Sequence, residues 1–405
     1  MRILLAHNNY KIYGGAEVFY HEVGRILKIN GNEVAYFSSQ EGDVDSEWKQ
    51  YFPKAPDYKK TGMLSGAIRM ADFIYNQSAK KDMARLIKDF KPDIIHVFAI
   101  YVKLTPSILV AAREAGVPVV MSCNDYKIIC PNYKLYHHQR ICMDCKGGRF
   151  YNAIINRCCH DSIKYSIASA IESYAHEWMD IYKKNVHTFL FASDFMAQTT
   201  EKFWGVGSFR WKKLKNPFDS LKYGQSNNVD GPVIFLGRLI EEKGMDVLLN
   251  AAKYCSDIMF KIIGDGPDMA RLQKITNDLK MKNVNFAGPK WGDEADYELQ
   301  SCRFLVIPSV WHENYPYVIN QAFAYGKPVI GADRGGIPEL VKHGERGLIY
   351  EANDAQALAG HIKSLYYDAR LTEKMGRNAK IFSDEEFNDM RFYQNLLGIY
   401  KGILS

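Results

Sequence analysis

The sequence lacks any apolar run that approaches the roughly 18 residues needed by a membrane-spanning helix, and it lacks any low-complexity tract. The first absence argues against an integral membrane protein, and the second argues against a disordered or fibrous chain. The N-terminal run MRILLA has the length of a strand and lacks the features of a signal peptide. We therefore expect a soluble protein of the cytosol.

The chain does have the length and the apolar content for two folded domains. It has 405 residues, of which 47% are hydrophobic and 24% are charged, and a single core usually stops growing at about 250–300 residues. Short β-rich runs alternate with helical periodicity from Ile3–Ala6 to Thr188–Ala192 and again from Val233–Leu236 to Leu348–Tyr350. This alternation predicts an α/β protein with two doubly wound parallel sheets. Turn-forming residues indicate a linker near Asn216.

The residues that follow each strand are candidates for a binding site, because open α/β sheets bind ligands beyond the carboxyl ends of their strands. After Val233–Leu236 come Gly237 and Arg238, and Lys243 follows as a helix begins. Two cations beside a helix N-terminus suit a diphosphate, since each forms charge-assisted hydrogen bonds to phosphate oxygens. The alternative is a pair of ordinary surface cations.

Two further strand ends carry glycine or acidic residues. The glycines at 264–266 invite a dinucleotide-binding interpretation, but the third glycine of that fingerprint would fall at Met269, which argues against it. Farther along, Glu313 lies just before a helix predicted to begin near residue 317, and Gln321 lies inside that helix.

Four segments share their order and spacing with one known family: GRLIEEKG at 237–244, IIGDGP at 262–267, PSVWHENYPYVINQAFAYGKPVI at 308–330 and DRGGIPEL at 333–340. In these segments the sequence resembles the retaining glycosyltransferases of the GT-B fold, specifically family four. The resemblance spans essentially the whole chain. It implies two Rossmann-like domains that face a central cleft. Residues 1–216 would bind the acceptor, residues 217–385 would bind the nucleotide sugar, and a last helix at 386–405 would cross back to the first domain.

The resemblance implies transfer of a sugar from a UDP- or GDP-sugar to a glycan or polyprenyl-linked acceptor during the synthesis of a cell-surface polysaccharide. The transfer would retain the anomeric configuration, with a phosphate oxygen receiving the acceptor proton and no side-chain nucleophile. Catalysis would require no metal, because cationic side chains stabilise the departing diphosphate. Long loops often carry specificity, so we expect the segments 38–66 and 125–160 to line the acceptor site.

The resemblance also assigns roles to single residues. The implied catalytic set consists of Arg238 and Lys243 at the diphosphate, Glu313 as the first acid of the family's E-x7-E motif, and Asp125. The implied donor-binding set includes a glycine pair in the first domain, whose alternative is an ordinary turn, and backbone-rich segments of the second: Gly14, Gly15, Asn124, Gly237, Gly264, Pro289, Lys290, Tyr315, Pro316, Tyr317, Val318 and Gln321.

Two positions depart from the family's pattern. Gln321 stands where a glutamate usually accepts hydrogen bonds from the ribose, and a neutral amide gives up charge assistance. Asn124 precedes Asp125 in a segment that normally reads His-Asp, and that histidine would contact the donor sugar. An active enzyme is the preferred interpretation, because the residues implied at the diphosphate are present. A sugar-nucleotide-binding protein with weakened catalysis is the alternative.

Six of the eight cysteines lie between residues 123 and 159. Without a signal peptide, thiols are expected rather than disulfides. Cys142 and Cys145 have the two-residue spacing that lets two thiolates share one zinc, and Cys130 with Cys158 or Cys159 would complete a four-sulfur site. Nearby histidines are alternative ligands. The spacing leaves two interpretations open: a structural zinc, or thiols that bind no metal.

Positive charge is concentrated in the first half, where residues 1–216 contain 30 Lys/Arg against 21 Asp/Glu and include Lys59 and Lys60. This excess is either a solvated surface or a surface for an anionic membrane, and no motif that reads nucleic acid accompanies it. One predicted helix carries an apolar stripe, which is usually a core face. The alternative is peripheral contact with the inner face of the cell membrane. The stripe consists of Ile163, Ile167, Ile171, Tyr174, Trp178 and Ile181.

Overall fold

The computed structural model describes residues 1–42, 44–55, 70–226 and 230–405. Lys59 and Lys60 of the basic excess lie outside the described residues, as does most of the second half of the segment 38–66. The chain divides into two compact units. The first unit contains Met1–Leu135, Cys142–Pro217 and Phe392–Ser405, and the second contains Tyr136–Ile141 and Phe218–Arg391.

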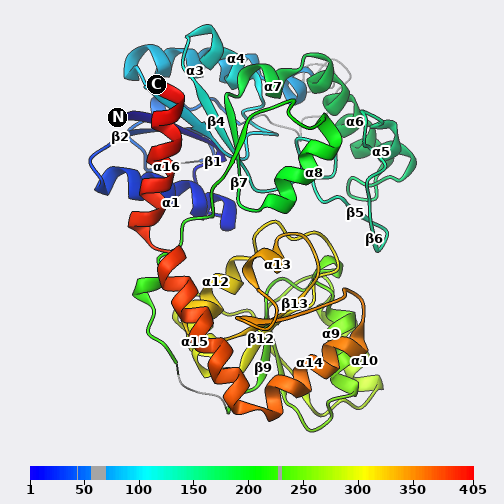
Figure 1. Ribbon diagram of the computed structural model, residues 1–405. Helices are drawn as coiled ribbons and strands as arrows, with labels where there is room; N and C mark the ends of the chain where they lie inside the picture. Colours follow the sequence, from blue (N-terminus) through cyan, green and yellow to red (C-terminus); the bar gives the residue numbers. More distant parts are fainter. Residues whose placement is uncertain (43, 56–69, 227–229) are drawn as a thin grey trace. The chain divides into compact units, whose positions relative to one another are not determined.

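The first unit is built on a six-stranded parallel sheet with the strand order β2-β1-β3-β4-β7-β8 (Figure 1). The strands are β1 (Arg2–Asn9), β2 (Glu33–Ser39), β3 (Ile94–Val97), β4 (Val119–Cys123), β7 (Thr188–Phe191) and β8 (Trp211–Lys213). Successive side chains of a strand point to opposite faces of the sheet. Leu4 and Ala6 accordingly belong to one core cluster, whereas Ile3 and Leu5 belong to another. Both faces of the sheet are therefore buried, as in doubly wound proteins.

Helices cover both faces of this sheet. They are α1 (Gly15–Ile29), α3 (Gln77–Phe90), α4 (Ser107–Glu114), α7 (Ile181–Asn185), α8 (Asp194–Trp204) and the C-terminal α16 (Asp389–Leu404). Two further helices, α5 (Tyr151–Ile155) and α6 (Ile163–Trp178), pack on each other in a separate small cluster. Phe392, Leu396 and Tyr400 of α16 are buried in the same cluster as Ile3. The Tyr400 hydroxyl lies 2.7 Å from Nδ1 of His96, a buried residue of β3. The last helix therefore completes the core of the first unit.

The apolar stripe on α6 is not a core face, and that prediction is wrong. Its residues from Ile163 to Trp178 are exposed, Trp178 by 87%, and only Ile181 at the start of α7 is buried. The buried residues of α6 are Ser166, Ala170, Glu172 and His176. Glu172 forms an ion pair with Lys127, and Nε2 of His176 lies 2.8 Å from the carbonyl oxygen of Ile74. Periodicity shows that the helix has an apolar face, but it does not show which face is buried. Here the buried face is the one whose polar side chains, Glu172 and His176, have partners in the protein.

The second unit repeats the architecture with the strand order β11-β10-β9-β12-β13-β14. Its strands are β9 (Val233–Leu236), β10 (Phe260–Ile263), β11 (Val284–Gly288), β12 (Phe304–Ile307), β13 (Val329–Ala332) and β14 (Gly347–Tyr350). Its helices are α9 (Met245–Lys253), α10 (Met269–Asp278), α11 (Asp293–Ser301), α12 (Tyr317–Ala324), α13 (Ile337–Leu340), α14 (Ala355–Tyr367) and α15 (Ala369–Glu386). Val233 and Phe235 belong to one core cluster and Ile234 to another, so both faces are buried here too.

Both sheets place the carboxyl ends of all their strands at one edge, because every pair of neighbouring strands is parallel. The strand order reverses beside β1 in the first sheet and beside β9 in the second. Such switch points are where open α/β sheets bind ligands. The predicted α/β class with two doubly wound sheets is confirmed. Within the described ranges, no helix combines the length and the apolarity that crossing a membrane requires.

Candidate functional site

The loop after β9 carries the two predicted diphosphate cations. Gly237 and Arg238 follow the strand directly, and a short 3-10 helix, η3 (Glu241–Lys243), leads into α9. Arg238 is exposed, and among the residues that the structure describes it forms no ion pair. Its guanidinium at the carboxyl edge of the central strand is therefore available to an anionic ligand.

Lys243 is joined to Glu313, which lies in the loop between β12 and α12. The Nζ atom of Lys243 lies 2.6 Å from Oε1 of Glu313, and the hydroxyl of Ser309 donates a hydrogen bond of 2.7 Å to the same oxygen. Burial raises the pKa of the Glu313 carboxyl, but the ammonium of Lys243 and these hydrogen bonds outweigh burial and leave the pKa below its usual value. Glu313 is therefore ionised at neutral pH and holds the lysine in place. The structure thus brings two predicted catalytic residues together.

Glycines let the loops at this edge approach each other through their main chains. Gly244 has φ +70°, and a Cβ there would lie 2.0 Å from the carbonyl oxygen of Pro308. Gly335 has φ +61°, and a Cβ there would lie 2.0 Å from the carbonyl oxygen of Glu313. The N–H of Gly336 also donates a hydrogen bond of 2.7 Å to that oxygen. The contacts of Gly335 and Gly336 hold the backbone of Glu313, and that of Gly244 holds the start of the same loop at Pro308.

One predicted donor-binding glycine, Gly264, has a packing role in the structure. It has φ +145°, and a Cβ there would lie 1.8 Å from the carbonyl oxygen of Gly237. The N–H of Gly264 donates a hydrogen bond of 2.9 Å to the carbonyl oxygen of Gly288. Gly264 therefore allows the loops after β9 and β10 to touch, whereas a Cβ on Gly237 would meet only the ring of Phe235. Pro289 and Lys290 follow Gly288 and β11, and the ammonium of Lys290 lies 3.5 Å from Glu298.

The remaining predicted donor residues surround the start of α12. Pro316 precedes the helix, and no side chain caps it. Tyr317 and Val318 are its first residues, so their N–H groups belong to the first turn, where an α-helix offers donors to an anion. Burial raises the pKa of Tyr315 well above its ordinary value, and its hydroxyl accepts a hydrogen bond of 3.4 Å from Asn320. Gln321 is half-buried, one turn into the helix.

The predicted residues of the first unit lie at the carboxyl edge of its sheet. Gly14 and Gly15 are exposed at the start of α1, and a Cβ on Gly15 would meet nothing within 4 Å, so packing does not require a glycine there. Asn124 and Asp125 follow β4 and are half-buried. Burial raises the pKa of Asp125 to about 6. Hydrogen bonds from the backbone N–H of Lys127 and from the Tyr101 hydroxyl act in the opposite direction and lower the pKa, but burial outweighs them. This carboxyl therefore titrates close to neutral pH.

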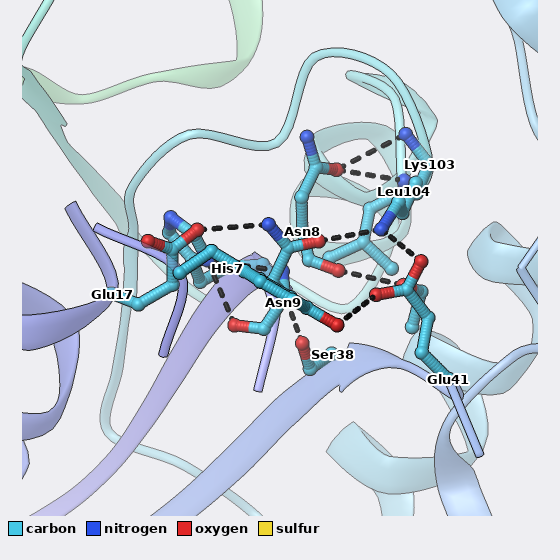
Figure 2. A network of polar contacts seen from close by, with 10 residues as sticks. His7, Asn8, Asn9, Glu17, Ser38, Glu41, Lys103 and Leu104 are labelled. Carbon is cyan, nitrogen blue, oxygen red and sulfur yellow. Dashed lines mark hydrogen bonds and ion pairs between the residues drawn. The ribbon is translucent and has the colours of Figure 1, made fainter. Parts of the chain in front are cut away.

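A network of polar side chains at the switch point of the first sheet was not predicted (Figure 2). Nζ of Lys103 donates a hydrogen bond of 2.6 Å to Oδ1 of Asn9 and forms an ion pair with Glu41. Nδ2 of Asn9 donates to Glu17 at 2.8 Å, and Oδ1 of Asn8 accepts the backbone N–H groups of Lys103 and Leu104. The signal in the sequence was the position of Asn8 and Asn9 at the end of the first strand, but their partners lie far along the chain.

Four predicted metal ligands of the first unit also come together. Cys130, Cys142, Cys145 and Cys158 line one small cavity, and none of the cysteines in the described residues forms a disulfide. Glu313 and Lys243 belong to the second unit, whereas Asn124, Asp125 and these cysteines belong to the first.

Comparison with known proteins decides the family. Residues 222–382 match the family described as glycosyl transferases group 1. The chain therefore contains a group 1 glycosyl transferase domain. All the predicted site residues of the second unit lie within the matched stretch. The grouping of Arg238, Lys243 and Glu313 is therefore a feature of a glycosyltransferase domain.

Proteins similar to this chain are found both by sequence and by structure. An uncharacterized glycosyltransferase of Methanocaldococcus jannaschii is 33% identical over 150 residues, which cover 37% of this chain and 42% of that protein. The lipopolysaccharide core biosynthesis glycosyltransferase LpsE of Rhizobium meliloti is 30% identical over 148 residues, or 36% of this chain and 43% of LpsE. These matches thus span less than half the length of either relative.

A solved structure matches nearly the whole chain. The crystal structure of Anabaena HepE in complex with UDP superimposes with a TM-score of 0.70 at 18% identity, and the match covers 99% of this chain and 100% of that one. At this identity the likeness concerns the fold, and it confirms the GT-B class that the sequence predicts.

Proposed function

We propose that the chain is a retaining glycosyltransferase of family four that transfers a sugar from a UDP- or GDP-sugar to a glycan or polyprenyl-linked acceptor in the synthesis of a cell-surface polysaccharide. The observation that carries the proposal is the grouping of Arg238, Lys243 and Glu313 at the carboxyl edge of the second sheet, within a group 1 glycosyl transferase domain. The complex of HepE with UDP and the role of LpsE in lipopolysaccharide synthesis support these classes of donor and product.

In this proposal, catalysis consists of stabilising the departing nucleoside diphosphate. The ammonium of Lys243 has three N–H donors, of which one is directed to Glu313, so the others remain for phosphate oxygens. Arg238 offers a planar fork of donors that is free of any ion pair within the described parts of the chain. Two fixed cations at developing negative charge lower the barrier without a metal. A phosphate oxygen then receives the proton of the acceptor hydroxyl.

The first turn of α12 would bind the diphosphate from the other side. The N–H groups of Tyr317 and Val318 suit phosphate oxygens, because the N-terminus of a helix attracts negative charge. Gln321 follows one turn later and would accept a hydrogen bond from a ribose hydroxyl through its amide oxygen. A neutral acceptor binds ribose more weakly than a carboxylate, but the amide can also donate.

We assign acceptor binding to the polar network of the first unit. Asn9, Glu17, Glu41 and Lys103 combine amide, carboxylate and ammonium groups beside the exposed loop that contains Gly14 and Gly15. Sugar hydroxyls both donate and accept hydrogen bonds, so a mixed set of this kind suits them. The position at a topological switch point supports the same assignment.

We further propose that α6 attaches the protein to the cytosolic face of a membrane, where a polyprenyl-linked acceptor would be found. Five apolar side chains from Ile163 to Trp178 are exposed on one face of this helix, while its polar face is buried. Lys164, Lys183 and Lys184 lie beside or just after the stripe and would attract anionic lipid headgroups. An exposed tryptophan at the end of such a helix suits the interfacial region of a bilayer.

The enzymatic proposal is tested by measuring binding and hydrolysis of UDP-, GDP- and ADP-sugars, followed by transfer to lipid-linked glycan acceptors. We expect one nucleotide class to bind and its sugar to be transferred with retention, as judged by NMR of the product. Arg238→Ala should weaken binding of the free nucleoside diphosphate, whereas Lys253→Ala on α9 should not. Binding without release or transfer of sugar would instead favour a sugar-nucleotide-binding protein with weakened catalysis.

The membrane proposal is tested by sedimentation with vesicles. We expect binding to vesicles that contain anionic lipid and much weaker binding to neutral ones. Trp178→Ser should reduce binding several-fold, while Trp291→Ser, which alters an exposed tryptophan of the second unit, should leave it unchanged. Equal binding by both variants would remove α6 from the membrane contact.

A further inference from the structure

A small cavity in the first unit is lined by four cysteines and three asparagines. The cysteines are Cys130, Cys142, Cys145 and Cys158, and the asparagines are Asn132, Asn152 and Asn156. Leu135 and Ala153 complete the lining. Cys130 and Cys145 are buried, while Cys142 and Cys158 are half-buried. Four thiols around one cavity form the set of ligands that a closed zinc site uses.

The chain is folded so that three separate turns present these thiols. The N–H of Cys142 donates a hydrogen bond of 2.9 Å to the carbonyl oxygen of Leu135, which returns the chain toward Cys130 after a short hairpin. In the turn that carries Cys145, the N–H of Lys146 donates to the carbonyl oxygen of Met143 at 3.0 Å. After α5, the N–H of Cys158 donates to the carbonyl oxygen of Ala153 at 3.1 Å.

The asparagines hold these turns together. Nδ2 of Asn132 donates a hydrogen bond of 3.3 Å to the carbonyl oxygen of Cys158. Nδ2 of Asn152 donates 2.7 Å to the carbonyl oxygen of Asp144, between Cys142 and Cys145, and Nδ2 of Asn156 donates 3.1 Å to the Asp144 carboxylate. Side chains that bridge the backbone segments of all the ligands provide the second layer of hydrogen bonds that metal sites require.

One of the asparagines also contacts a thiol directly. The sulfur of Cys130 donates a hydrogen bond of 2.9 Å to Oδ1 of Asn132. A zinc ion would replace that proton, because zinc binds cysteine in the thiolate form.

We propose that Cys130, Cys142, Cys145 and Cys158 bind one structural Zn²⁺. In the described residues no three of these sulfur atoms lie within 4.8 Å of one another, whereas Zn–S bonds of about 2.3 Å place the sulfurs roughly 3.8 Å apart. Rotation about a single χ1 angle moves a cysteine sulfur by about 3 Å. The thiols would reorient in this way when the metal binds, and four sulfur ligands would leave it no open position for substrate.

The geometry distinguishes Cys158 from Cys159. Cys158 lines the cavity, but Cys159 does not, and its N–H donates a hydrogen bond of 3.1 Å to the hydroxyl of Ser166 at the start of α6. Cys123 is also outside the cavity and is buried at the end of β4. The zinc would therefore fix the segment that runs from Asp125 to α6, which joins the edge of the first sheet to the exposed stripe.

Metal analysis of untagged protein, purified without chelators under reducing conditions, tests the proposal. We expect about one zinc per chain, and we expect Co²⁺ that replaces it to show the strong absorption of tetrahedral thiolate coordination. Titration with a mercurial reagent should release the zinc in parallel with the modification of four thiols. These measurements use the intact protein and do not depend on enzymatic activity.

Single variants test the ligand set. Cys158→Ser should lose most of the zinc, while Cys159→Ser should retain it, and so should Cys302→Ser in the second unit. If Cys159→Ser lost the zinc and Cys158→Ser retained it, the assignment of Cys158 as a ligand would be overturned. If the protein contains no zinc and metal-free protein takes up neither Zn²⁺ nor Co²⁺, the site does not exist; an iron–sulfur absorption spectrum would equally overturn it. If Cys158→Ser is unable to fold without its metal, the cobalt spectrum and the mercurial titration of the unmodified protein show whether four thiolates bind the metal.

Discussion

At the carboxyl edge of the second sheet, neighbouring loops touch through their main chains at Gly244, Gly264 and Gly335. At the same edge of the first sheet, the chain is held instead by side chains, with Lys103 between Asn9 and Glu41. The two units share one architecture, but they fix their edges by different means. An edge that is held by main-chain contacts has no room for added side-chain atoms, and in the sequence it corresponds to short motifs that contain glycine. A site built from side chains can change one residue at a time, which would suit the acceptor binding that we propose for this unit.

The largest effect is expected where the main chains of the second unit are closest. Gly244→Ala combines a positive φ with a contact of 2.0 Å to Pro308, so we expect it to lower the free energy of unfolding by at least ~3 kcal/mol. Gly344 has φ +79° and open space around it, so Gly344→Ala should cost only about 1 kcal/mol. Urea unfolding of both variants measures the difference, and equal losses would mean that the close approach is unimportant.

Lys243→Ala tests the ion pair within that rigid frame. We expect turnover to fall at least tenfold, which corresponds to about 1.4 kcal/mol of transition-state stabilisation. The exposed Lys253→Ala on α9 serves as the matched control. A double-mutant cycle with Glu313→Gln should give a coupling energy above about 1 kcal/mol in unfolding experiments, because the two groups lie 2.6 Å apart. Additive effects would show that the pair is not energetically coupled.

The raised pKa of Asp125 predicts that the stability of the first unit depends on pH. Its raised pKa of about 6 means that the protonated form is favoured by folding, so this contribution to stability is complete below the ordinary pKa near 4 and is lost as the pH rises through 6. Asp125→Asn should therefore raise the melting temperature, relative to the unmodified protein, more at pH 7.5 than at pH 4.5. If the carboxylate is catalytic, turnover of the unmodified protein should also fall as the pH decreases below 6. The residual turnover of Asp125→Asn should show no such decrease.

The smallest effect is expected in the side-chain network of the first unit. Lys103→Ala removes the group shared by Asn9 and Glu41, and we expect the KM for the acceptor to rise a few-fold while donor binding stays unchanged. Lys88→Ala, at an exposed position of α3, is the control. A change in donor affinity that exceeds the change in acceptor KM would contradict the division of roles between the units.

The same contrast explains how much the sequence could predict. Val233–Leu236 was predicted to the residue and the glycine loops were recognisable, because the signals are local and the strands are buried on both faces. The network at Asn9 was not predicted, since its partner Lys103 lies 94 residues away and no local pattern links the two. The strand β8 (Trp211–Lys213) lies beyond the last β-rich run predicted for the first half of the chain. The face of α6 was assigned wrongly, because an ion pair with Lys127 outweighed the apolar pattern.

The position of α16 has a consequence for the order of events during synthesis. Residues 1–217 leave the ribosome first, yet Phe392, Leu396 and Tyr400 complete the core around Ile3 and His96. Translation proceeds at about 5–20 residues per second. The first unit therefore lacks α16 for on the order of 10–30 s, while Phe218–Arg391 is synthesised. During that interval an apolar surface of the nascent chain stays uncovered.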